Sequence, residues 1–198
     1  MKKIIALIIT FTLVVSFVSN VHAKRGSDGQ LNLLYWQAPS TMNPNLSGGT
    51  KELEASSVVI EPLARYDEKG NMLPWLAEEI PTVENGGVSK DLTSITWKIK
   101  KGIKWSDGSA LTADDVVFTY EYCINPDTGC SHTNYYAGIS SVKALDRHTV
   151  KIEFNVAKPF PYSAFVGYNT PILQKAQFDG CQGTKAQECT KQNFYPIG

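Results

Sequence analysis

The apolar and polar positions between residues 95 and 123 follow two different periods. Ile95, Trp97 and Ile99 alternate with polar residues, which is the period of a strand with one buried face. The segment Ser106-Asp107-Gly108 then predicts a turn, because Gly108 can take a positive φ. We therefore expect a half-buried strand followed by a tight turn.

A helix is expected after this turn. Thr112 lies three residues before Asp115, which is close to a capping box with Asp where Glu or Gln is usual. Apolar residues then recur at helical spacing, at Val116, Val117, Tyr120 and Cys123. Nothing in this strand, turn and helix suggests chemistry, so the stretch is interpreted as a scaffold element.

The residues before this stretch predict further short elements. Residues 30–36 are rich in strand-forming residues and precede a proline-rich loop over 37–44. Thr50 is expected to cap a helix that runs through Val59. A strand over 63–66 then leads into a hairpin turn over 67–71.

The residues after the helix predict two more strands, over 142–145 and 149–154. The block 49–155 therefore reads as a small α+β unit with a mostly antiparallel sheet. Beyond it, short helices are expected over 162–166 and after 171–173.

The first 23 residues have the pattern of a secretory signal peptide. Lys2 and Lys3 precede an uncharged apolar run over 4–18, and Val21 and Ala23 stand at the −3 and −1 positions of a cleavage site. A helix over this run would reach only about 22 Å, against a hydrocarbon core of roughly 30 Å, so a membrane anchor is the weaker alternative. No Cys follows the run, so we expect cleavage after Ala23 and no lipid anchor.

The charge balance excludes one class of partner. The chain has 19 basic and 19 acidic residues, and removal of Lys2 and Lys3 leaves a net charge of about −2. This net charge provides no excess of positive charge to attract nucleic acid or an anionic membrane, so we expect no nucleic-acid partner.

Four cysteines remain after export: Cys123, Cys130, Cys181 and Cys189. An even number in an oxidising compartment predicts two disulfides, for which three pairings are possible. We favour the two local pairings, Cys123–Cys130 and Cys181–Cys189, because residues 125–129 can form a turn. In the chain-entropy model, a disulfide that closes a loop this short would stabilise the folded state by about 2.5 kcal/mol. The alternative is a zinc site that adds His132, although the spacings contain no CxxC.

The chain offers little for catalysis. Outside the signal segment its histidines are His132 and His148, and it contains no GxSxG, HExxH or P-loop motif. Asp114-Asp115 could be taken as a carboxylate pair, but the predicted helix start explains both residues better. We expect neither an enzyme nor a cofactor or metal.

One long run carries a family resemblance. The run GIKWSDGSALTADDVVFTYEY, with the residues just before it, follows an ordered pattern. The pattern begins with R/K-x-G-V-K/R followed by an aromatic residue. It continues with D-G-x-x-h-T-A-x-D-V, where h is a hydrophobic residue, and ends in a helix that contains aromatic residues. The matching positions are Lys101, Gly102, Lys104, Trp105, Asp107, Gly108, Leu111, Thr112, Ala113, Asp115, Val116 and Tyr120. This pattern resembles the signature of the solute-binding protein family 5 of ABC importers, which includes dipeptide-, oligopeptide- and nickel-binding proteins.

The resemblance implies a fold class. It is α/β, a periplasmic binding protein-like class II bilobal fold with an inserted α+β domain. On the family's pattern, residues 24–48 and 156–198 form a discontinuous, incomplete lobe I, and residues 49–155 form the inserted domain. In the family the motif near 195–198 continues into another strand, so we expect an N-terminal piece from which lobe II is absent.

The resemblance also implies a function. The family's members capture a ligand between two lobes and deliver it to membrane permease subunits. We therefore expect a peptide as ligand and a monomer in the periplasm. Seven residues are expected at the cleft: Trp36, Gln37, Thr41, Asn43, Tyr136, Tyr168 and Asn169.

Other interpretations stay open. Each of these seven residues could instead serve core or surface packing. The same scaffold could bind a nickel chelate, an oligosaccharide, haem or an opine, because fold does not fix the ligand. A stand-alone interaction module is a third interpretation. Residues 35–67 resemble peptide-binding members more than nickel-binding ones, which favours peptides.

Overall fold

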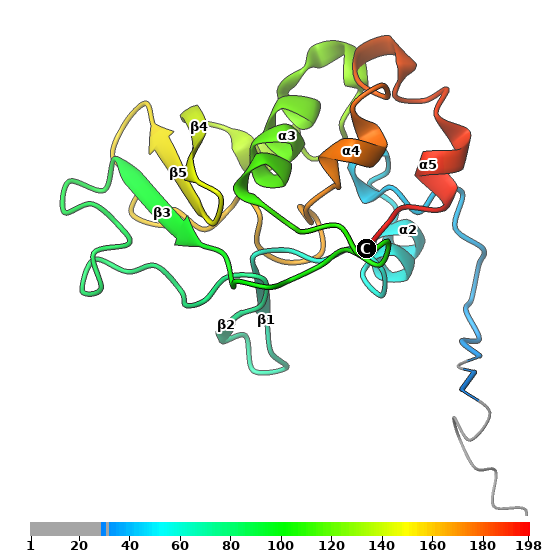
Figure 1. Ribbon diagram of the computed structural model, residues 1–198, viewed down its shortest axis with the longest axis horizontal. Helices are drawn as coiled ribbons and strands as arrows, with labels where there is room; N and C mark the ends of the chain where they lie inside the picture. The colour runs from blue at the N-terminus through cyan, green and yellow to red at the C-terminus, as the bar shows by residue number, and fades with distance from the viewer. Residues whose placement is uncertain (1–28, 31) are drawn as a thin grey trace, which may run out of the picture. The chain divides into compact units, whose positions relative to one another are not determined.

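The structure is a computed structural model that describes residues 29–30 and 32–198 (Figure 1). Residues 37–198 form one compact unit, and the described residues up to Trp36 belong to a separate unit. The predicted signal peptide lies outside the described residues. The division into lobe I and an inserted domain stays a prediction.

Both sheets of the compact unit are antiparallel, as the sequence predicts. Strands β1 (Ala64–Tyr66) and β2 (Met72–Pro74) form a hairpin. In its turn, the Asp67 carboxylate accepts hydrogen bonds from the backbone N–H groups of Lys69 and Asn71, at 2.9 and 2.7 Å. These bonds hold the turn that the sequence predicts for 67–71.

The second sheet has three strands in the order β3-β5-β4. Its members are β3 (Ser94–Lys98), β4 (Ile139–Asp146) and β5 (Thr149–Phe154). Ile95 lies opposite Ile152, and Trp97 lies opposite Val150, so both strands turn their apolar positions to the same face. The predicted period of β3 is confirmed, because Ile95 and Trp97 are buried and the residues between and beside them are more exposed.

The main helix is α3 (Ala113–Ile124), which packs beside β4 (Figure 1). The predicted capping box is present, and the backbone N–H of Thr112 donates to Asp115 Oδ2 at 2.8 Å. The other helices are α2 (Thr50–Ser56), α4 (Lys175–Phe178) and α5 (Thr190–Phe194). Short 3-10 helices are η1 (Pro44–Leu46), η2 (Pro126–Thr128), η3 (Thr133–Tyr136) and η4 (Gly183–Lys185).

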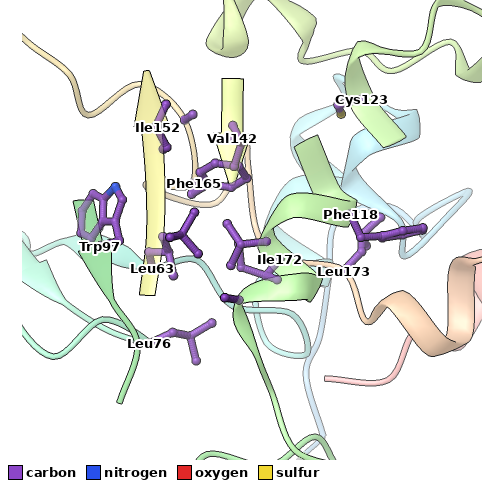
Figure 2. Close-up of a cluster of buried hydrophobic side chains, with 14 of the residues drawn as sticks. Leu63, Leu76, Trp97, Phe118, Cys123, Val142, Ile152, Phe165, Ile172 and Leu173 are labelled. Carbon is purple, nitrogen blue, oxygen red and sulfur yellow. The ribbon is translucent and has the colours of Figure 1, made fainter. Parts of the chain in front are cut away.

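One cluster of buried apolar side chains joins these elements (Figure 2). Trp97 and Ile152 come from the three-stranded sheet and Phe118 from α3, while Phe165 and Ile172 come from the later segment. Burial of each such side chain stabilises the fold by about 1.5–3 kcal/mol. The residues on both sides of the predicted boundary at 155 therefore share one core. No helix among the described residues is both long and apolar enough to span a membrane.

Three predicted elements differ in the structure. Residues 30 and 32–36 form no strand, and no described strand pairs with them, so the propensity of the segment is not realised. Residues 162–166 form a turn instead of a helix, because Val166 bridges to Ala64. Helix α2 begins after Gly49 as N-cap, so Thr50 is its first residue, and it ends at Ser56 instead of Val59.

The predicted disulfides are confirmed, Cys123–Cys130 and Cys181–Cys189. Their Cα atoms lie 5.1 and 5.8 Å apart, within the range that a disulfide spans. The zinc alternative is therefore wrong, since every cysteine is paired in a disulfide.

Candidate functional site

A groove of about 550 Å³ opens beside β1. Aromatic side chains from three separate segments dominate its lining: Tyr66, Tyr135, Phe160, Tyr162 and Tyr168. Phe160 and Tyr168 are 58% and 51% exposed, so their rings are available to a ligand. An apolar, aromatic lining with a few polar groups is typical of ligand sites.

A sharp turn at Phe165 builds one wall of the groove. The Leu63 N–H donates to the Phe165 carbonyl at 2.9 Å, and the Gly167 N–H donates to the Ala64 carbonyl at 2.8 Å. Phe165 has a φ of +62°, a left-handed conformation that costs a non-glycine residue roughly 1–2 kcal/mol. Full burial of its ring offsets this cost. The turn thereby places Val166 and the two residues after Gly167 at the groove.

Tyr168 and Asn169, two of the predicted ligand-contacting residues, line the groove. They follow the turn at Phe165 and border the same hollow as Arg65 and Tyr66 of β1. Their contact with a ligand stays a prediction.

Tyr136 lies in the core instead of the groove. It is 3% exposed, and its ring lies 5.5 Å from that of Phe165 and 5.9 Å from that of Tyr120. Burial raises the pKa of its hydroxyl above the usual range, and that hydroxyl has no hydrogen-bond partner among the described residues. The preceding residue, Tyr135, lines the groove. The structure therefore places Tyr135 at the groove and the predicted Tyr136 in the core, because a 3-10 helix turns successive side chains in different directions.

Asn43 is also a buried structural residue. Its amide group donates to the Tyr122 hydroxyl at 3.2 Å and to Asn193 Oδ1 at 3.0 Å. Its own Oδ1 accepts from the Asn45 N–H at 3.1 Å and so caps η1. These bonds use both amide hydrogens of a fully buried side chain, so the structure gives Asn43 a structural role and does not place it at the groove.

Gln37 and Thr41 are not among the residues that line the groove. The Thr41 hydroxyl donates to the Asn193 carbonyl at 3.2 Å, and Thr41 borders a smaller hollow of about 200 Å³. Gln37 is exposed. Trp36 belongs to the first unit, where it is 70% exposed and its ring lies 6.4 Å from that of Tyr35.

Arg65 is the one charged residue in the lining of the groove among the described residues. Its Nη2 donates to the Ser57 carbonyl at 3.3 Å and to Glu61 Oε1 at 3.4 Å. The guanidinium lies 4.2 Å from the centre of the Trp75 ring, which is a cation–π contact. Among the described residues, no three His, Cys, Asp or Glu side chains gather as metal ligands would.

Comparison with known proteins identifies the family. The profile of the bacterial extracellular solute-binding proteins, family 5 Middle, matches residues 71–198. The chain belongs to this family. The family predicted from residues 101–120 is therefore confirmed.

Individual relatives point to the same group. The oligopeptide-binding protein OppA of Bacillus subtilis (strain 168) is 29% identical over 205 residues, which cover 88% of this chain and 36% of the relative. The periplasmic oligopeptide-binding protein OppA of Escherichia coli (strain K12) is 27% identical over 156 residues, 70% of this chain and 27% of the relative. The chain thus spans about a third of the length of these relatives.

Solved structures confirm the predicted fold class. The oligopeptide-binding protein AppA of Bacillus subtilis, in complex with a nonapeptide, matches with a TM-score of 0.68 and 28% identity, over 79% of this chain and 29% of its own. NikZ of Campylobacter jejuni, in complex with Ni(L-His), matches with a TM-score of 0.66 and 25% identity, over 82% of this chain and 30% of its own. The named relatives OppA and AppA are oligopeptide-binding proteins.

Proposed function

We propose that this chain is part of the binding component of an ABC importer, and that its groove forms one wall of a peptide-binding cleft. The observation that carries the proposal is the aromatic groove beside β1 in a chain of this family. A peptide presents main-chain donors and acceptors together with apolar side chains, which exposed rings and uncharged polar groups can accommodate. A relative of the same fold, AppA, was solved with a nonapeptide.

Within this proposal, Tyr168 and Asn169 contact the ligand, and Tyr135 joins them in place of Tyr136. All three line the groove, and Tyr168 is half exposed. Trp36, Gln37 and Thr41 stay candidate contacts from the sequence, in the loop that precedes the groove-forming segments.

Ligand identity is tested on the full-length protein by native mass spectrometry, followed by calorimetric titration with the peptide that is released. We expect a co-purified peptide, and we expect Tyr168→Ala to weaken its binding at least about tenfold, the loss expected for a buried ring contact. Tyr195→Ala is the matched control, since Tyr195 is 76% exposed and does not line the groove. A co-purified nickel chelate or sugar without any peptide would overturn the proposal.

We also propose that the chain is exported to the periplasm as a monomer without a lipid anchor, where it delivers its ligand to the permease subunits of the importer. The support is the signal-peptide pattern of residues 1–23 and the family's description as extracellular. N-terminal sequencing of protein from the periplasmic fraction should begin at Lys24. Recovery of the chain only from the membrane fraction, with residues 1–23 intact, would contradict this.

A further inference from the structure

We propose that Arg65 gives the groove its preference for charge, so that the site selects ligands that present a carboxylate to β1. This inference rests on the proposed peptide-binding function and deepens it. Both a peptide's C-terminus and an acidic side chain carry a carboxylate, so the shared chemistry is the planar anion that a guanidinium binds through two parallel hydrogen bonds.

The placement of Arg65 is fixed by the strand that carries it. Arg65 is the central residue of β1 and pairs with Leu73 of β2. The neighbouring Ala64 is fully buried, and its carbonyl accepts a hydrogen bond from the Gly167 N–H at 2.8 Å. The backbone that carries the Arg65 side chain is therefore hydrogen-bonded on both sides. This fixed backbone holds the side chain at the groove.

The guanidinium itself is held in a defined orientation. One face of it lies over Trp75 at 4.2 Å from the ring centre. The Trp75 main chain is fixed in turn, because its N–H donates to the Leu63 carbonyl at 2.9 Å and its carbonyl accepts from Lys100 Nζ at 2.7 Å. A guanidinium that is already oriented loses less conformational entropy when it binds an anion.

Part of the guanidinium fork is available to a ligand. The hydrogen bonds that Arg65 makes among the described residues both use Nη2, and their lengths of 3.3 and 3.4 Å exceed the usual range for N–H···O bonds. The side chain is 31% exposed. Nη1 and Nε therefore remain to donate to a carboxylate.

Glu61 does not cancel this preference. It pairs with Arg65 at 3.4 Å, and its side chain is 40% exposed, so the pair is a long, solvated one of little energy. Glu61 is also absent from the groove lining, whose other members are uncharged. A cationic ligand group would be repelled by the guanidinium, and the lining has no carboxylate to offset this repulsion. An anionic ligand group is complementary to the guanidinium.

The test is calorimetric titration of the full-length protein with two pairs of peptides. The first pair is Ala-Ala-Ala and its C-terminal amide. The second is Ala-Glu-Ala amide and Ala-Gln-Ala amide. A preference for the acid in the first pair would show that Arg65 binds the C-terminal carboxylate. A preference for the acid in the second pair would show that it binds a side-chain carboxylate. We expect at least about a tenfold preference for the acid in one pair, the size expected of a hydrogen bond to a charged group.

Three variants assign the preference to Arg65. Arg65→Gln should remove the preference, so that the acid and the neutral partner of the pair bind this variant with affinities within about twofold of each other. Arg65→Lys keeps the charge and should retain part of the preference. Arg147→Gln is the matched control, since Arg147 is exposed in the turn between β4 and β5, outside the groove lining.

The outcomes separate this inference from the peptide function. If the wild-type protein binds acidic and neutral peptides equally, or if Arg65→Gln keeps the preference, the inference is overturned while peptide binding stands. If the wild-type protein binds none of the four peptides and carries a different solute, the peptide function fails, and the inference falls with it. Unchanged thermal unfolding of Arg65→Gln shows that a lost preference is not a loss of fold.

Discussion

Glu52 is a buried carboxylate that connects the loop before η1 to helix α2. It is 1% exposed, and its Oε1 accepts from the Ser40 N–H at 2.8 Å and from the Ser40 hydroxyl at 2.7 Å. Lys51 Nζ lies 2.7 Å from the same oxygen. Burial alone would raise the pKa of Glu52, but these hydrogen bonds outweigh it and lower the pKa from 4.5 to about 2.

We predict that Glu52 makes the stability of the fold sensitive to acid. Its pKa is lower in the folded than in the unfolded state, so its contribution is complete above about pH 4.5 and is lost as the pH falls towards 2. The contribution at neutral pH is about 3 kcal/mol. Urea unfolding at several pH values should show Glu52→Gln well below the wild type at pH 7, with the gap closing towards pH 2.

Glu121→Gln is the control for this experiment, because Glu121 is exposed on α3. Its unfolding free energy should stay within about 0.5 kcal/mol of the wild type throughout. A gap between Glu52→Gln and the wild type that stays constant from pH 7 to pH 2 would show that the carboxylate charge is not what stabilises this contact.

At the residue scale, the sequence predicted the groove only in part. Tyr168 and Asn169 follow a turn and reach the groove, whereas Asn43 and Tyr136 are buried. Periodicity cannot separate Tyr135 from Tyr136, since both are aromatic and lie in a single 3-10 turn. The role proposed for Arg65 also leaves no local signal, because the guanidinium is oriented by Trp75, which follows β2.

Asp115 shows how one side chain can stabilise two helices. Its Oδ2 accepts from the Thr112 N–H at 2.8 Å, and its Oδ1 accepts from the Lys175 N–H at 2.9 Å. The first bond caps α3, and the second satisfies a free N–H group at the start of α4. The residue is 6% exposed, so both hydrogen bonds are largely shielded from water.

We therefore predict that Asp115→Ala lowers the free energy of unfolding by about 2 kcal/mol or more, the upper range for a lost cap, because a second buried donor is left unpaired. Asp114→Ala is the matched control on the same helical turn, and it should cost less than about 1 kcal/mol, since Asp114 is exposed. Urea unfolding at pH 7 measures both. Equal losses for the two variants would mean that only their shared position near the helix start matters.

At the element scale, prediction succeeded where the local pattern and the tertiary contacts agree. The hairpin turn, β3, β5 and α3 carry their own turn or capping residues, so their sequences determine them. Residues 162–166 have no such signals. There the bridge between Val166 and Ala64, a contact across about a hundred residues of chain, decides the conformation.

At the scale of the whole molecule, the disulfides lie where the later segment meets the earlier one. Cys123–Cys130 joins the end of α3 to the segment after η2, and Cys181–Cys189 joins the end of α4 to the start of α5. The Gly183 N–H, inside the second loop, donates to the Thr128 hydroxyl, inside the first, at 3.0 Å. The two cross-linked loops therefore contact each other and stabilise the packing of residues 156–198 on the rest.

The last prediction concerns these cross-links. Unfolded wild-type protein should show no titratable thiol without reductant and four with it, whereas the double variant Cys181→Ser with Cys189→Ser should show two with reductant. This variant should unfold at a free energy about 2.5 kcal/mol lower, because an open loop gains entropy in the unfolded chain. When reductant opens Cys181–Cys189 in the wild type, the wild type and the variant should have the same free energy of unfolding. Four thiols without reductant would show that export does not oxidise the chain, and the stability assigned to both loops would then have to come from their packing alone.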